Sequence, residues 1–153
     1  MDWSAYTTLE FVPPDGHHAQ KRSEKHGFVY IWFFCVGEEE FPFYVGETYR
    51  IWGRVDDYYW ASFQAPTDFK VGEALRYLGS EKISVKMRFR AVDDRNAEEK
   101  KLLREFGKPN LLNSLTGYDY AVADQGNERE EVRNFIRGLV QGVRKDQNSP
   151  LND

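Results

Sequence analysis

One apolar run constrains the fold of this chain more than any other feature. The segment Phe28–Val36 reads FVYIWFFCV, as expected for a strand that is covered on both faces. Gly37 and the glutamates at 38–40 cannot lie in a core, so the chain turns there. A second apolar segment, Phe41–Val45, returns at once, and its Pro42 stands near the start, where a missing N–H matters least. The pattern predicts a hairpin around which the other elements are organised.

A helix is predicted directly after this hairpin. Gly46 ends the second strand, and Thr48 can cap a helix because its hydroxyl accepts a backbone N–H. The residues of this helix that we expect to face the core are Ile51, Trp52 and Val55.

Three tyrosines and one arginine of the predicted hairpin and helix are candidate site residues. Tyr30 lies within the first strand and Tyr44 near the end of the second. Arg54 follows about two turns into the helix, and Tyr58 is at i+4 on the same helix face. A hairpin docked on its helix would bring these groups to one rim. Each residue also has a plain structural reading, because tyrosines pack well in strands and helical arginines are usually solvated.

The segment Ile83–Val92 alternates between apolar and polar residues, which predicts a third antiparallel strand. Its apolar side chains should face the core, and its basic side chains should share the opposite face. This basic face is either a contact for a DNA phosphate backbone or an ordinary solvated surface. The candidate DNA-binding residues are Lys86, Arg88 and Arg90.

Two more helices are predicted on either side of this strand. Between Trp60 and Gly79, an insertion capped by Thr67 or Asp68 contacts the substrate or simply packs. The helix over residues 93–106 has Asn96 as its expected N-cap, so Glu99 falls at N3 and could complete a capping-box-like pair. The residues expected to face the core from these two helices are Val71, Leu75, Leu78, Leu102, Leu103 and Phe106.

The final helix is predicted over residues 127–144, opened by Asn127 with Glu130. Its apolar residues recur at i, i+3 and i+4, so it packs either on the same domain or on a partner. With 153 residues, the chain is expected to form one α+β domain over 27–146, with a partly flexible arm at 1–26 and a flexible tail at 147–153. The expected sheet is small, three-stranded and antiparallel, and it is flanked by helices.

The net charge, the single cysteine and the absence of long apolar runs restrict the classes of function that we expect. A net charge of −4 counts against a strong nonspecific nucleic-acid binder, but the field near a site matters more than the total charge. The single Cys35 permits no internal disulfide and fits a reducing cytoplasm. No signal peptide or membrane-spanning run is recognisable, so we expect a cytoplasmic protein without a membrane partner.

Five short motifs occur in a characteristic order over about residues 27–115: Phe28-Val29-Tyr30, Tyr44-Val45-Gly46, Arg54 with Tyr58, Glu99-Lys100-Lys101-Leu102-Leu103, and Pro109-Asn110-Leu111-Leu112-Asn113. This series resembles the GIY-YIG nuclease superfamily. The chain departs from the family in having Phe28 in place of the first glycine and a longer turn between the two tyrosines. It also has Glu47 after Gly46, where some members carry a lysine that favours phosphate.

The resemblance implies a site that hydrolyses phosphodiester bonds with one divalent ion. Carboxylate-bound Mg²⁺ or Mn²⁺ supplies charge and Lewis acidity, a guanidinium matches two phosphate oxygens, and a phenol relays a proton. Glu98 replaces Glu99, or Asn110 replaces Asn113, if the register is shifted. The implied roles are metal binding for Glu99, a phosphate clamp for Arg54, proton acceptance for Tyr30, orientation of water or phosphate for Tyr44 and Tyr58, and loop fixation for Asn113.

The sequence therefore predicts a divalent-metal-dependent DNA endonuclease. The alternative is a noncatalytic nucleic-acid-binding or protein-binding module on the same scaffold, which the acidic pI and Glu47 favour. A third reading is an interaction protein that acts through its last helix. Specificity would come from the insertion, the arm, the last helix, a homodimer partner or a larger complex, and the sequence leaves open whether DNA is nicked or cut through.

Overall fold

A four-stranded antiparallel sheet with the order β1-β4-β2-β3 forms the centre of the computed structural model. The structure describes residues 1–11, 27–54, 66–116 and 126–148. The strands are β1 (Thr7–Phe11), β2 (Gly27–Val36), β3 (Glu39–Thr48) and β4 (Val85–Val92). The helices are α2 (Pro66–Ser80), α3 (Arg95–Phe106) and α4 (Gly126–Gln147), and the 3₁₀ turns are η1 (Lys108–Asn110) and η2 (Leu112–Ser114). The α+β class and the antiparallel sheet flanked by helices are confirmed.

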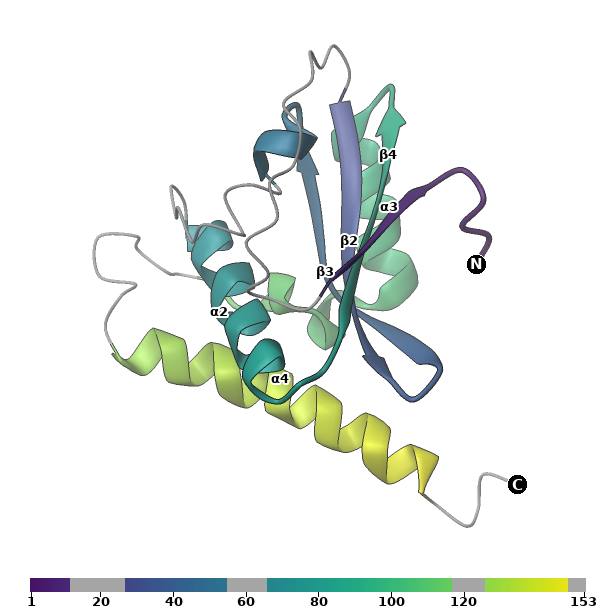
Figure 1. The fold of residues 1–153 in the computed structure, drawn as a ribbon. Helices are drawn as coiled ribbons and strands as arrows, with labels where there is room; N and C mark the ends of the chain where they lie inside the picture. The colour runs from purple at the N-terminus through teal and green to yellow at the C-terminus, as the bar shows by residue number, and fades with distance from the viewer. Residues whose placement is uncertain (12–26, 55–65, 117–125, 149–153) are drawn as a thin grey trace.

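Strand β2 is central because it pairs with β3 on one side and with β4 on the other. Helices α2 and α4 lie on one face of the sheet and α3 on the other, so both faces of β2 are buried (Figure 1). Ile31 and Trp32 are successive fully buried residues on opposite faces. The apolar run therefore has the structural cause that the sequence indicated.

The hairpin β2–β3 contains a bulge between Trp32 and Phe33, where Phe33 is opposite Pro42. Proline lacks an N–H, and it is tolerated here because β3 is an edge strand and the ladder is already interrupted. Gly37 makes the turn with a φ of 64°, which glycine adopts without a steric penalty.

The sheet contains one strand that the sequence did not predict. Part of the expected N-terminal arm forms β1, which pairs with β4 from Thr7↔Phe89 to Phe11↔Val85. Leu9 packs against the α2/α4 side of the core, and Glu10 lies beside Lys86. Five residues with only two apolar side chains, Leu9 and Phe11, give too weak a periodicity to be recognised in the sequence. The rest of the arm, residues 12–26, lies outside the described ranges.

Three predicted helices occur as α2, α3 and α4. Helix α2 begins at Pro66 and α4 at Gly126, so the predicted caps Thr67, Asp68 and Asn127 lie inside these helices. Of the helix predicted after the hairpin, residues 51–54 are helical, and Val55 lies outside the described residues. Helix α3 also starts at a different residue from the one predicted. Its N-cap is Asp94, which accepts the N–H of Ala97, and not Asn96. Glu99 is therefore beyond N3, and the capping-box explanation for this residue is wrong. The helix ends at Gly107, with a φ of 81°, as predicted. Residues predicted to face the core from α2, α3 and α4 are buried or partly buried there: Val71, Leu75, Leu78, Leu102, Leu103, Phe106, Val132, Phe135, Ile136, Leu139, Val140 and Val143.

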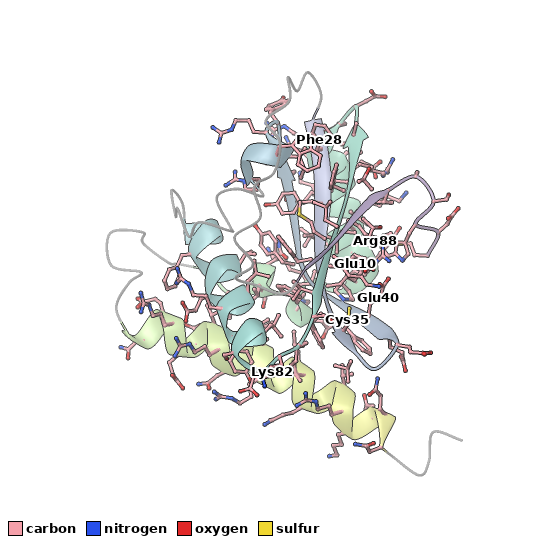
Figure 2. All side chains as sticks on the ribbon, viewed as in Figure 1. Glu10, Phe28, Cys35, Glu40, Lys82 and Arg88 are labelled. Atoms are coloured by element: carbon pink, nitrogen blue, oxygen red, sulfur yellow. The ribbon has the colours of Figure 1, made fainter. Side chains whose placement is uncertain are left out.

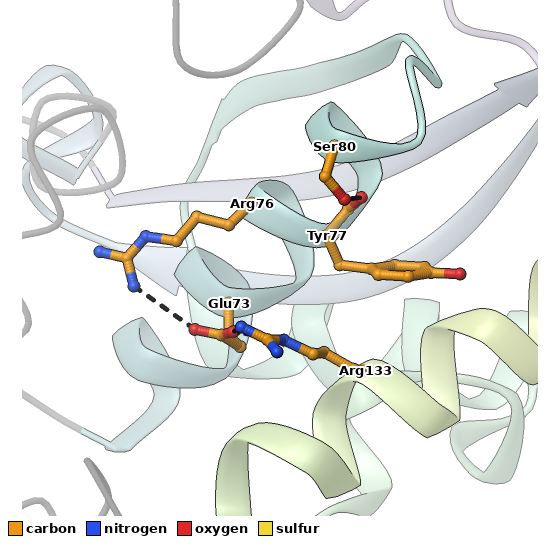
Figure 3. Close-up of polar contacts among 5 residues, drawn as sticks. All are labelled: Glu73, Arg76, Tyr77, Ser80 and Arg133. Atoms are coloured by element: carbon orange, nitrogen blue, oxygen red, sulfur yellow. Dashed lines mark hydrogen bonds and ion pairs between the residues drawn. The ribbon is translucent and has the colours of Figure 1, made fainter. Parts of the chain in front are cut away.

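Helix α4 packs against α2 and the sheet, which favours packing within the chain over packing on a partner. An ion pair with one buried member joins the two helices: Glu73 of α2 is 1% exposed and accepts from the partly exposed Arg133 of α4 at 2.7 Å (Nε) and 2.6 Å (Nη2) (Figure 3). Arg76 approaches the second oxygen of Glu73 at 3.4 Å. A buried carboxylate needs such partners, because leaving it unpaired is strongly unfavourable. None of the described helices has the length and apolar character needed to cross a membrane.

The closest packing in the hairpin predicts a specific response at Gly46. A methyl group there would lie 2.3 Å from Cζ of Tyr30, so Gly46→Ala should lower the unfolding free energy by about 1–3 kcal/mol. Gly138→Ala on α4 is the control, because nothing lies within 4 Å of its added methyl, and it should stabilise by about 0.5–1 kcal/mol. Urea denaturation measures both effects. In a Tyr30→Ala background the penalty at position 46 should largely disappear, and an unchanged penalty would contradict the contact.

Candidate functional site

The first and second motifs lie side by side towards the end of β3, where Tyr30 is opposite Gly46. The register Phe28↔Thr48 and Gly27↔Val92 places the end of β3, the start of β2 and the end of β4 together. Helix α3 begins directly after β4 and therefore starts at this same end (Figure 1). Residues 51–54 are helical and lie just beyond β3. Thr48 accepts the N–H of Arg50 at 2.9 Å, but the helical segment starts at residue 51, so this bond closes a turn before the helix and Thr48 is not its N-cap.

Tyr30 and Gly46 are direct partners across β2 and β3, and the tyrosine ring lies over the glycine. The distance from the ideal Cβ position of Gly46 to the hydroxyl oxygen of Tyr30 is 2.4 Å, so only glycine fits at this position. The ring of Tyr44 has its centroid 6.1 Å from that of Tyr30. Both tyrosines are mostly covered, with 2% and 5% of each residue exposed. The two motif strands thus form one packed unit that depends on glycine.

Asn113 fixes the outer edge of this unit. Its amide accepts the N–H of Val45 at 3.0 Å and donates to the C=O of Val45 at 2.7 Å, as a neighbouring strand would. Val45 stands between Tyr44 and Gly46, so a side chain 68 residues away holds the second motif in place. Asn110 only donates to the C=O of Phe106 at an exposed position. The geometry therefore favours Asn113 over Asn110 as the loop-fixing residue.

Lys70 of α2 supports the turn that carries Asn113. Its ammonium group is buried and donates to the C=O of Leu112 at 3.1 Å and to the C=O of Leu115 at 2.6 Å. Burial, together with the nearby charge of Lys108, lowers the pKa of Lys70 to about 8. The sequence analysis missed this residue. Its only signal is a lysine between Phe69 and Val71, which are both buried.

Glu99 and Glu98 have different surroundings on α3. Glu98 accepts from Arg90 at 2.8 Å and is therefore occupied by an ion pair. Within the part of the chain that the structure describes, the carboxylate of Glu99 has no hydrogen-bond or ion-pair partner. Burial raises the pKa of Glu99, and the charges of Arg95, Lys108 and Lys100 oppose that rise. Of the two glutamates, Glu99 is the better candidate ligand for a cation.

Arg95 connects the start of α3 with the end of β3. It forms an ion pair with Glu47, and its guanidinium lies 3.8 Å from the ring centroid of Tyr49. Its aliphatic part packs against Gly27, where an added Cβ would lie 3.1 Å from Cδ of Arg95. The cation that contacts Glu47 thus comes from α3. Neither Arg95 nor Tyr49 belongs to a motif, so their contact could not be predicted from motif spacing.

The structure also locates Arg54, whereas Tyr58 lies outside the described residues. Arg54 is half-buried, and its N–H donates to the C=O of Arg50 at 2.8 Å, within the turn that follows β3. Tyr30 and Tyr44 belong to the α2/α4 side of the sheet, and α3 with Glu99 covers the other side. Tyr30 and Tyr44 therefore lie on the opposite face of the sheet from α3, the helix that carries Glu99.

The predicted DNA-binding residues of β4 alternate with the core residues as expected, but all three have acidic partners. Lys86 pairs with Glu10 and Glu40 at 3.3 Å each. Arg88, which is 9% exposed, pairs with Glu40 at 2.5 Å (Figure 2). Arg90 pairs with Glu98. The guanidinium of Arg88 also lies between the rings of Trp3 and Phe33, at 5.0 Å and 4.9 Å from their centroids. This face offers little unpaired positive charge to a phosphate backbone.

The residues present fit a mostly hydrated divalent ion at Glu99. Mg²⁺ is commonly held by one or two carboxylates and keeps several waters, and Glu99 is a half-buried carboxylate without a direct partner. Within the described ranges, no group of three or more His, Cys, Asp or Glu residues forms a closed metal site. The donor set is therefore that of an open site with a single carboxylate.

Comparisons with known proteins gave no match to a family model, to a curated protein or to a solved structure. The resemblance to GIY-YIG nucleases accordingly depends on the motif residues and on their arrangement.

The clamp on Val45 yields a direct prediction. Asn113→Ala removes two hydrogen bonds to a partly buried edge, so it should lower the unfolding free energy by about 1–3 kcal/mol. Hydrogen exchange at the Val45 amide should also accelerate. Asn110→Ala is the matched control, because its bond is exposed, and its effect should stay within about 0.5 kcal/mol. Unchanged protection of Val45 in Asn113→Ala would show that the amide does not hold this edge.

Proposed function

We propose that this protein is a divalent-metal-dependent endonuclease that hydrolyses DNA phosphodiester bonds through a GIY-YIG-type site. The observation that carries the proposal is the packing of Tyr30 on Gly46, with Asn113 clamped on Val45. These contacts join the first, second and last motifs of the resemblance, which are far apart in the sequence. Gly46 leaves the space that the Tyr30 ring occupies, and Asn113 makes both of its hydrogen bonds to one residue of the second motif.

Each proposed role follows from the chemistry of the side chain. Glu99 would hold Mg²⁺ or Mn²⁺, and the ion would supply charge and Lewis acidity at the scissile phosphate. Arg54 would clamp phosphate oxygens with its planar guanidinium. Tyr30 would accept the proton of the attacking water. Tyr44 and Tyr58 would orient water or phosphate, and Asn113 would keep the second motif in register.

The second candidate function is a noncatalytic module that binds nucleic acid or protein. Three observations favour it: Tyr30 and Tyr44 are almost fully covered, Glu47 replaces a phosphate-binding lysine, and the cations of β4 are paired with acids. DNA is the proposed partner of the nuclease, and nucleic acid or a protein is the partner of the noncatalytic module. A homodimer or a larger complex would add specificity, because the resemblance accounts for most of the chain.

Cleavage of supercoiled plasmid tests the proposal. The wild-type protein should convert plasmid to nicked or linear products with Mg²⁺ or Mn²⁺, and EDTA should stop the reaction. Arg54→Ala and Glu99→Gln should each lose at least about 100-fold in rate, as loss of a transition-state contact does. Glu98→Gln should retain activity, because Glu98 is held by Arg90. Normal cleavage by both Arg54→Ala and Glu99→Gln would overturn the assignment, and binding without cleavage would select the second candidate.

Glu99→Gln also has an expected effect on stability that separates function from folding. Burial raises the pKa of Glu99, so its charge disfavours the folded state above that pKa. At pH 7 the variant should therefore be at least as stable as the wild type in urea denaturation. Its advantage in unfolding free energy should shrink as the pH falls towards 4.5, because the Glu99 carboxyl of the wild type becomes protonated and is then neutral, as glutamine is at every pH. A variant that is less stable at pH 7 would show that the Glu99 carboxylate serves the fold.

A further inference from the structure

Tyr49 is a large aromatic residue that the fold leaves in solvent at the end of β3. It is 60% exposed, whereas Tyr30 and Tyr44, only a few residues away in the sheet, are almost completely buried. A single exposed tyrosine is unremarkable by itself. Tyr49 differs because its ring is held from one side, and because it stands beside the elements that carry the proposed site.

The support for the ring comes from Arg95. The guanidinium carbon lies 3.8 Å from the Tyr49 ring centroid, well within the range of a cation–π contact. Arg95 is itself fixed by its ion pair with Glu47 and by packing on Gly27. The ring thus has one face on a positioned arginine and a large exposed surface. An aromatic ring held in this way loses little entropy when a flat ligand stacks on it.

The charge around the ring suits a nucleotide. Arg50 is the next residue and is exposed, and Arg54 follows one turn later in the helical segment 51–54. Their guanidinium groups complement a phosphate, while the ring of Tyr49 complements a base, since every nucleobase has a flat π face. Glu99 lies one helical turn from Arg95, so the proposed metal ligand is near the Tyr49–Arg95 pair.

We propose that Tyr49, backed by Arg95, stacks on an unpaired nucleobase next to the phosphodiester that is cleaved. This inference rests on the proposed function and names its substrate class. Bases inside a duplex are already stacked on their neighbours, so an exposed ring can stack only on a base that is single-stranded, bulged, mismatched or at an end. The substrate is therefore DNA with an unpaired nucleotide at the site.

Binding of fluorescein-labelled single-stranded DNA in EDTA measures the stacking without cleavage. Tyr49→Leu keeps the apolar bulk but removes the π face, and it should weaken binding roughly 5- to 150-fold. Tyr49→Phe and Tyr49→Trp keep the ring and should bind within a few-fold of the wild type. Fully paired duplex of the same sequence should bind more weakly and should not respond to Tyr49→Leu.

A second readout reports the stacking directly. Single abasic substitutions along the oligonucleotide should reveal one position at which base removal weakens the wild type but not Tyr49→Leu. With 2-aminopurine at that position, the wild type should quench the fluorescence and Tyr49→Leu should not. Equal affinity of the wild type and Tyr49→Leu for single strands, or equal dependence on every base, would overturn the proposal.

The outcomes separate this inference from the proposed nuclease. If Tyr49→Leu changes neither cleavage with Mg²⁺ nor DNA binding, the stacking role of Tyr49 is wrong and the nuclease proposal still stands. If binding depends on a base that stacks on Tyr49 but no cleavage occurs with Mg²⁺ or Mn²⁺, the stacking role stands and the nuclease proposal is wrong. A wild-type protein that binds neither single-stranded nor duplex DNA would overturn both.

Discussion

The contact of the Tyr30 ring with the backbone of Gly46 is the constraint on which the rest of the site depends. It closes β2 onto β3 at a place where no larger residue than glycine fits. The outer side of β3 is then held by Asn113, and the turn that carries Asn113 is held by Lys70 from α2. A continuous series of contacts thus runs from the central strand to a helix on its α2/α4 face. Such a series fixes side chains more accurately than a loop could.

Much of the fold could be predicted because burial leaves a periodic pattern. The run in β2, the alternation in β4 and the stripe of α4 each indicated the correct element and the correct inward face. Strand β1 was missed because it is only five residues long. The N-cap of α3 was misassigned because Asp94 and Asn96 are equally good N-cap residues by type. Of the site, Tyr30, Tyr44 and Asn113 were indicated by spacing. Lys70, Arg95 and Tyr49 were not, since their contacts arise only from tertiary packing.

The electrostatics explain how an acidic protein could still have a nucleic-acid site. On β4 the basic residues are neutralised by Glu10, Glu40 and Glu98, so that face contributes to stability more than to attraction of phosphate. At the end of β3, Arg50 is exposed, and Arg95 supports the exposed ring of Tyr49 while it pairs with Glu47. Glu99, a half-buried carboxylate, follows Arg95 by one helical turn. Local arrangement, not net charge, would then determine binding. It would also favour a small unpaired target over a long duplex.

The most direct test of this account is to locate a bound paramagnetic ion by NMR. Mn²⁺ titrated into ¹⁵N-labelled protein broadens the amide signals nearest to it. The account predicts that broadening is strongest around Glu99 and is lost in Glu99→Gln. Signals of Glu38 and Glu39, in the hairpin turn at the opposite end of the sheet, should persist at the same Mn²⁺ concentration. Broadening centred on that turn, or equal broadening in the wild type and Glu99→Gln, would contradict the proposed site.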